Sequence, residues 1–265
     1  MESTGANAPA PGRAAPSFLR LVGRAALAAA VLTAAAALLQ HQAGLFKEGR
    51  FLVDPLSVAL KARGISVVES DILVTARLRE GPPPTFSELK AIAEQLAARM
   101  PAGERSLWSD AGSGYAAVYV EGAEPEGGRW VASARYIPGT GDSGRVEASV
   151  RRRFYGLPEG LARLVRWTEQ AVLRAAGPSS PLEGKAVFQG RPAGDEPREQ
   201  LAAGLLGELG AAVRYQELAG DRYVAAGWTP KLPGRTAIGG QAVNVTVTVR
   251  RHGQGEWVEV ETPIL

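Results

Sequence analysis

The chain has 265 residues, of which 45% are apolar and 22% are charged, as expected of a globular protein with a sizeable core. It contains no cysteine, which excludes a disulfide framework, a thiolate zinc site and a cysteine nucleophile. The formal net charge is +3, but Arg13, Arg20 and Arg24 against Glu2 place +2 of it within the first 24 residues. The remaining chain therefore carries only +1, which argues against a nucleic-acid-binding domain.

The amino-terminal region predicts a link to a membrane. Residues 1–24 have the composition of a disordered tail, and residues 25–46 are 22 residues without a charge. As a helix, that stretch is long enough to cross a hydrocarbon core of roughly 30 Å. The arginines precede it, so the tail is expected in the cytoplasm and the rest of the chain outside. A cleaved signal peptide remains open, because the apolar stretch at 25–39 also fits one.

Three further regions follow: a first α+β half at 47–155, a linker helix within 156–178 and a second α+β half at 179–265. In the first half, apolar and polar residues alternate from Ile72 to Arg79, which predicts a half-buried strand. Thr85 and Glu88 form an S/T-x-x-E pattern that predicts the start of a helix. Strands are expected at about 114–121, 129–138 and 145–151, and the linker helix at Leu157–Ala176.

The second half is expected to repeat this order. Arg129–Pro138 returns in similar form as Arg222–Pro230, which indicates an internal repeat. Asp195 is expected to cap a helix that ends near Gly210. The strands expected around this helix are 185–189, 213–216, 222–229, 242–251 and 256–262. The predicted fold is therefore α+β, with two pseudo-repeated strand-helix-antiparallel-strand halves and helices on one face of a curved sheet, preceded by the membrane or signal helix.

The carboxy-terminal part carries a recognisable series of structural motifs. They are Gly227-Trp228-Thr229-Pro230, the run Gly239-Gly240-Gln241-Ala242-Val243-Asn244, the pair Arg250-Arg251 and the ending Thr262-Pro263-Ile264. In these motifs, over about residues 195–264, the chain resembles the YwmB-like family of Gram-positive bacteria. The resemblance implies a TATA-box-binding-protein-like fold and an amino-terminal membrane or signal segment. It implies no catalytic residues.

The motifs that could carry chemistry do not fit their context. Gly139–Gly144 reads GxGxxG, but a strand rather than a helix is expected next, so a hairpin loop is favoured and no cofactor is predicted. His252 is the only histidine outside the membrane segment and sits in a turn, which argues against nucleophilic or metal catalysis. Glu259 and Glu261 share a strand face and leave open a glycan-acting enzyme that uses acidic residues.

The outward faces of the predicted strands supply the candidate binding surface. It consists of Asn244, Thr246, Thr248, Arg250, Glu259 and Glu261. We therefore expect a membrane-anchored, extracytoplasmic, non-enzymatic binding or scaffolding module, with Trp257 or Tyr136 embedded in the open face. A possible partner is an envelope protein or an anionic polymer, the latter through Arg163, Arg166 and Arg174 with the upstream run 151–153. Nucleic-acid binding by a saddle-shaped sheet is the remaining alternative, and the balanced charge argues against it. The sequence does not indicate an oligomeric state.

Overall fold

The computed structural model describes residues 53–139, 143–253 and 255–265 of the chain. All of the described elements belong to one compact unit, Glu48–Leu265. No helix within these described ranges has the length and apolar character needed to cross a membrane. The expected tail at 1–24 and the membrane or signal segment at 25–46 lie outside the described residues.

The described residues form four helices and one large antiparallel sheet, so the expected α+β class is confirmed. The helices are α2 (Val53–Ala62), α3 (Phe86–Ala97), α4 (Leu161–Ala176) and α5 (Arg198–Glu208). The strands of the large sheet are β1 (Ile65–Gly81), β2 (Arg105–Gly112), β3 (Tyr115–Ala123), β4 (Gly128–Pro138), β5 (Gly144–Tyr155), β6 (Leu182–Pro192), β7 (Ala212–Ala219), β8 (Arg222–Trp228), β11 (Val245–His252) and β12 (Gly255–Pro263). A separate small hairpin pairs β9 (Thr236–Ile238) with β10 (Gln241–Val243).

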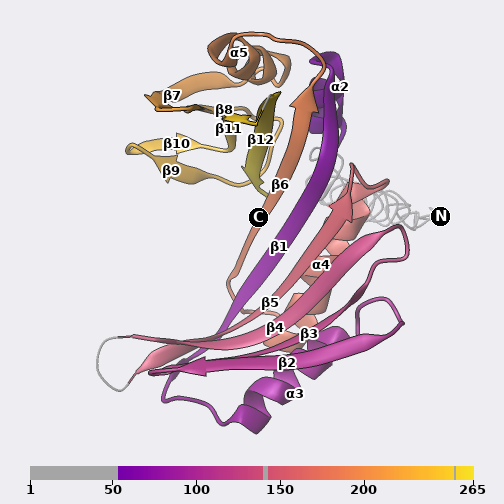
Figure 1. Ribbon diagram of the computed structural model, residues 1–265. Helices are drawn as coiled ribbons and strands as arrows, with labels where there is room; N and C mark the ends of the chain where they lie inside the picture. The colour runs from indigo at the N-terminus through magenta and orange to yellow at the C-terminus, as the bar shows by residue number, and fades with distance from the viewer. Residues whose placement is uncertain (1–52, 140–142, 254) are drawn as a thin grey trace, which may run out of the picture. The chain divides into compact units, whose positions relative to one another are not determined.

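The ten strands follow the order β2-β3-β4-β5-β1-β6-β12-β11-β8-β7, and every neighbouring pair is antiparallel. The long strands β1 and β6 pair with each other at the centre of the sheet (Figure 1). In one half, β1 is followed in the chain by α3 and then by β2, β3, β4 and β5, which lie in that order from the sheet edge inward to β1. In the other half, β6 is followed by α5 and then by β7, β8, β11 and β12, which lie in that order from the opposite edge inward to β6. The strand order is therefore the same when read from either edge.

The repeated sequence motif does not lie in equivalent strands. Its first copy forms β4, between β3 and β5, whereas its second copy forms β8, which lies next to the edge strand β7. By position, β4 corresponds to β11 and β8 corresponds to β3. Both strands bury one face, and on each the buried residues include an aromatic residue and alanines, which explains the similar sequences.

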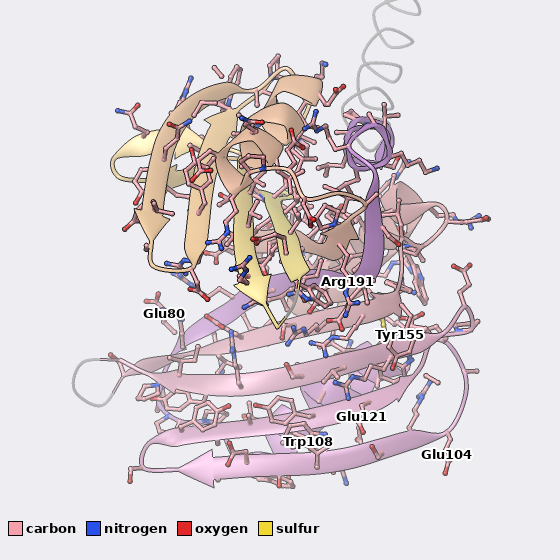
Figure 2. All side chains as sticks on the ribbon, turned by 45° about the horizontal axis from the view of Figure 1, so that its top comes forward. Glu80, Glu104, Trp108, Glu121, Tyr155 and Arg191 are labelled. Carbon is pink, nitrogen blue, oxygen red and sulfur yellow. The ribbon has the colours of Figure 1, made fainter. Side chains whose placement is uncertain are left out.

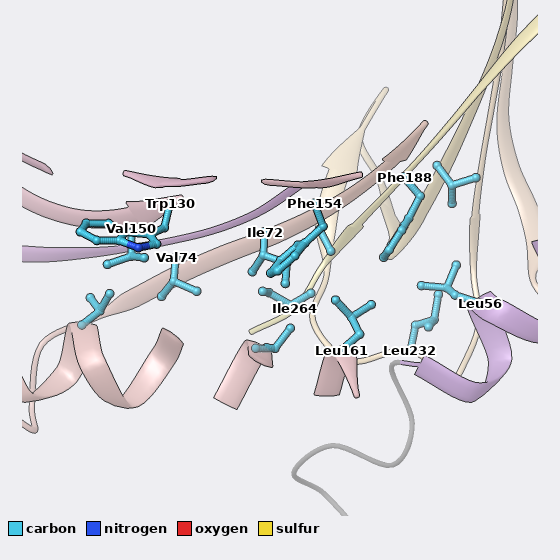
Figure 3. Packing of buried hydrophobic residues seen from close by; sticks show 14 of the residues in the cluster. Leu56, Ile72, Val74, Trp130, Val150, Phe154, Leu161, Phe188, Leu232 and Ile264 are labelled. Carbon is cyan, nitrogen blue, oxygen red and sulfur yellow. The ribbon is translucent and has the colours of Figure 1, made fainter. Parts of the chain in front are cut away.

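The core lies between one face of the sheet and the helices. Alternate residues of the strands point into it, as Ile72 and Val74 of β1 do, and the helices supply Leu56 and Leu161 (Figure 3). The start of α3 was predicted correctly. The side chain of Thr85 accepts from the backbone N–H of Glu88 and completes the capping box there. The opposite face of the sheet is polar and carries none of the four described helices (Figure 2).

Several expected boundaries were wrong, each for a local reason. Pro197, rather than Asp195, is the N-cap residue of α5, because a residue that precedes proline favours an extended backbone and the helix starts only after it. The linker helix begins at Leu161 rather than Leu157, since Gly160 takes a left-handed conformation with φ of 64°. Helix α2 and strand β2 were not anticipated.

Candidate binding surface on the open sheet face

The polar face of the sheet contains two adjacent hollows over its central strands. The larger has a volume of about 580 Å³ and the smaller one of about 330 Å³. Both are lined by Leu73 of β1, Lys185 of β6 and Glu261 of β12, so they adjoin each other. We call the two together the central recess.

In the larger hollow, a single carboxylate is clamped by two arginines. Glu147 lies 2.8 Å from Nη2 of Arg135 and 2.6 Å from Nε of Arg145, and only 9% of its side chain is exposed. On the other side of the hollow, Nζ of Lys185 lies 3.3 Å from a carboxylate oxygen of Glu261. The sheet register sets two of these pairs, because Arg135 lies directly opposite Glu147 and Lys185 lies diagonally across from Glu261. Arg145 is two residues from Glu147 on β5 and therefore shares its face.

The smaller hollow is built in the same way. Asp71 accepts hydrogen bonds from Arg151 on β5 and lies 3.6 Å from Nη2 of Arg153, which also reaches Glu69 at 2.9 Å. The hydrogen bond that Arg151 donates to Asp71 raises the pKa of Arg151 above its ordinary value. Gln189 donates to Glu259 at 2.8 Å. The hollow is therefore lined by side chains that hold one another in place.

Taken together, the central recess is electrically neutral and mostly paired. Its lining contains six cationic and six acidic side chains: Arg135, Arg145, Arg151, Arg153, Lys185 and Arg235 against Glu69, Asp71, Glu147, Glu183, Glu259 and Glu261. Within the described ranges, Arg235 and Glu183 of the larger hollow have no ion-pair partner. These two side chains can meet the charges of a ligand without first breaking a pair.

The structure brings five of the six expected surface residues onto this face. Thr246 lies directly opposite Glu261, Thr248 opposite Glu259, and Arg250 follows on the same face of β11. Glu259 and Glu261 line the central recess, whereas the β11 residues flank it. Trp257 also lies on this face, with the guanidinium of Arg191 4.9 Å from its ring centroid. Tyr136 instead points into the core and is 4% exposed.

Asn244 does not belong to the surface, which corrects the sequence analysis. It is fully buried, and its side chain accepts from the backbone N–H of Thr229 while donating to the carbonyl oxygens of Thr229 and Leu232. The expected continuous strand 242–251 is accordingly interrupted, with β10 ending at Val243 and β11 beginning at Val245. Alternation alone could not distinguish an outward asparagine from one that satisfies buried backbone groups.

The arginine run of β5 is divided between the two faces of the sheet. Arg151 and Arg153 point to the open face, whereas Arg152 points into the core, because neighbouring strand residues alternate. Arg152 is 2% exposed and forms two hydrogen bonds to Glu124, at 2.6 and 2.7 Å. Its guanidinium also lies 4.6 Å from the ring centroid of Trp167 on α4. The run therefore does not extend a basic stripe along α4, and sequence reasoning missed this buried pair.

A hollow of about 450 Å³ lies on α4 beside Arg163, Arg166 and Trp167. Two of the three arginines expected to form the basic stripe therefore share one hollow. Arg174, in the last turn of α4, is exposed but does not line it.

An aromatic group occupies the open face near the β2 edge. The rings of Trp108 and Tyr119 stack with centroids 3.8 Å apart, and the hydroxyl groups of Tyr119 and Tyr115 are 2.9 Å apart. Burial and the hydrogen bond to Tyr115 raise the pKa of Tyr119 to about 12. Trp108 is nevertheless 44% exposed, so this group remains open to contact (Figure 2).

The remaining motifs have the positions expected of connections. Pro138 pairs with Gly144 across the β4–β5 hairpin, so the GxGxxG segment joins two strands and opens no helix. His252 pairs with Gly255 at the end of the β11–β12 hairpin. In the part of the chain that the structure describes, no cluster of three or more histidine or acidic residues is arranged to hold a metal ion.

A comparison with protein-family models finds no match, and a search of curated proteins also finds none.

Proposed function

We propose that the chain is a membrane-anchored, extracytoplasmic binding or scaffolding module of the YwmB-like type, without enzymatic activity, that acts at the cell envelope. The observation that carries this proposal is the central recess, a broad hollow in an open sheet face whose charges are balanced and mostly paired. A partner with mixed charges can exchange ion pairs with such a surface at little cost in net charge.

The exposure of these charges supports recognition rather than catalysis. The side chains of Arg135, Arg145, Lys185 and Glu261 are each at least 40% exposed. Charges screened by water interact weakly, whereas catalytic groups need a preorganised, water-excluded site. The glycan-acting alternative depends on Glu259 and Glu261, and both already bond to cross-strand neighbours on β6.

The mirrored strand order supports two finer proposals. We infer that the two halves descend from one duplicated unit and that the fold is of the TATA-box-binding-protein-like kind. Nucleic-acid binding through this face is the weaker alternative. A duplex binder neutralises phosphates with a surplus of lysine and arginine. The central recess has no such surplus, because its six cationic side chains are matched by six acidic ones.

Charge reversal in the recess tests the binding role. We expect the double variant Glu259→Lys with Glu261→Lys to fold normally but to lose its chemical crosslinks to envelope components in intact cells. The matched control is Glu199→Lys with Glu208→Lys on α5, which changes the net charge by the same amount at exposed positions on the helix side. Equal crosslinking by both double variants would contradict the proposal.

Protease treatment of sealed protoplasts tests the placement outside the membrane. We expect external protease to degrade the region 53–265 of the unaltered chain. The same region should be protected in a variant whose orientation in the membrane has been inverted. Protection of this region in intact protoplasts of the unaltered chain would contradict an extracytoplasmic location.

A further inference from the structure

The two edges of the large sheet are built differently. At the β7 edge, the pairing with β8 shifts register between Val213 and Tyr215, and the β9–β10 hairpin contacts the strand, although six of the eight β7 residues are exposed. Arg214 fixes that hairpin by donating to the carbonyl oxygen of Ala242 at 2.6 Å. A bulge and a covering segment are two of the devices by which proteins prevent unwanted pairing at a sheet edge.

The β2 edge lacks both devices. Strand β2 pairs with β3 in unbroken register from Arg105 to Gly112, and all eight of its residues are exposed. Helix α3 packs mainly on β3 and β4, and β2 forms the border of the sheet (Figure 1). The strand contains no proline and no lysine. Its outer row of backbone N–H and C=O groups is thus available to another strand.

Two side chains of β2 offer apolar anchors, one on each sheet face. Leu107 and Trp108 are both 44% exposed. Tyr119, on the inner neighbour β3, covers one face of the Trp108 indole, at a ring angle of 12°. Because β2 is the edge strand, the other face of the indole is directed beyond the sheet. An added strand would place a side chain there.

The charge around Trp108 is acidic. Asp110 lies two residues from Trp108 on the same face, and Glu121 accepts from Ser106 at 3.0 Å on its other side. Glu104 precedes the strand (Figure 2). The one cation of the strand, Arg105, lies on the opposite face, 5.6 Å from the ring centroid of the buried Trp130. The open indole face is therefore bordered by carboxylates, which favours a cationic neighbour.

From these contacts we propose that β2 is a docking edge that captures an extended, basic segment of a partner protein by strand addition. The segment continues the sheet through backbone hydrogen bonds, places a lysine or arginine against Trp108 and meets Asp110 and Glu121 with further positive charge. A second copy of this chain fits less well. Antiparallel pairing of β2 with itself brings Asp110 opposite Glu104 or opposite the Ser106–Glu121 pair of the other copy.

The test uses the full-length chain in mild detergent and a labelled eight-residue peptide that alternates lysine and valine. We expect saturable binding, with slowed amide hydrogen exchange in β2 and not in β7. Binding should weaken by about tenfold in Trp108→Ala, as for an anchor residue at an interface. In Asp110→Lys, it should weaken for this peptide and strengthen for a matched glutamate–valine peptide. Trp228→Ala, at an exposed tryptophan next to the β7 edge, is the control and should bind normally.

Two results would overturn the proposal. The same peptide N-methylated at every backbone nitrogen keeps its charge but cannot form the strand hydrogen bonds. If it binds as well as the parent, the contact is simple charge attraction. If the chain forms dimers in sedimentation that Trp108→Ala abolishes, the edge pairs with a second copy instead of a basic partner.

Discussion

The buried ion pair between Glu124 and Arg152 provides a quantitative test of the packing between the sheet and α4. The two side chains are 1% and 2% exposed, and two hydrogen bonds join them at 2.6 and 2.7 Å. Glu124→Gln keeps the shape of the side chain but removes its charge. Arg152 then becomes a buried cation without a counter-charge, and its Nη1 already has no hydrogen-bond partner among the described residues.

The expected loss follows from this burial. Removing one member of a buried pair costs about 3–5 kcal/mol, because the remaining charge stays desolvated. The ring of Trp167 stabilises Arg152 only in part, since cation–π contacts contribute roughly 0.5–2 kcal/mol. The control is Glu80→Gln, whose partner Arg77 lies at 3.5 Å with both side chains largely exposed; such pairs contribute about 0–1 kcal/mol.

Urea unfolding followed by tryptophan fluorescence measures both variants. The account predicts a decrease in the urea midpoint of about 1–2 M for Glu124→Gln, at an m-value of roughly 2–3 kcal/mol/M. The double variant Glu124→Leu with Arg152→Met should be more stable than Glu124→Gln, because it leaves no buried charge. A loss below about 1 kcal/mol for Glu124→Gln, or a double variant less stable than it, would refute the reasoning.

Three further predictions concern other parts of the fold. Asn244→Ala should lower the free energy of unfolding by about 2 kcal/mol or more in urea melts, since it leaves the buried N–H of Thr229 and the C=O of Leu232 without partners, and the C=O of Thr229 with only the 3.5 Å contact from the N–H of Leu232. Thr248→Ala on the open face should change the free energy of unfolding by less than about 0.5 kcal/mol. Gly128→Ala should prevent normal folding, seen as loss of the cooperative thermal transition, because φ is 120° there and a Cβ would overlap the facing strand; Gly103→Ala, which has open space, should not. Tyr119 should ionise near pH 12 in a 295 nm absorbance titration. Because its pKa is raised in the folded state, its contribution to stability is present below pH 10 and is lost between pH 10 and pH 12. A pKa near the normal value of 10 would contradict its stacked, partly buried position.

The sequence predicts local features of the fold well. The alternation in β1, β5 and β11 and the capping box at Thr85 depend on neighbouring residues, and these predictions were correct in kind. Strand β2 was missed because an edge strand exposed on both sides has no alternating pattern to detect. The mirrored architecture was anticipated from a motif that does not occupy equivalent strands, so that expectation rested on the wrong residues.

The candidate site was less predictable, because its contacts join distant parts of the chain. Asp71 meets Arg151 across 80 residues, and Gln189 meets Glu259 across 70. Sequence spacing contains no information on such pairs unless the strand order is known. The alternation of the 151–153 run could have shown that its middle arginine points into the core. Nothing in the pattern around Asn244 indicated that it satisfies the backbone of Thr229.

Site-specific photo-crosslinking in intact cells tests the claim that the open sheet face binds a partner. A photoreactive residue at Val187, in the central recess, should form a defined adduct with an envelope component, whereas the same residue at Ala91, exposed on α3, should not. Adducts at Ala91 with none at Val187 would contradict the account and assign binding to the helix side of the molecule.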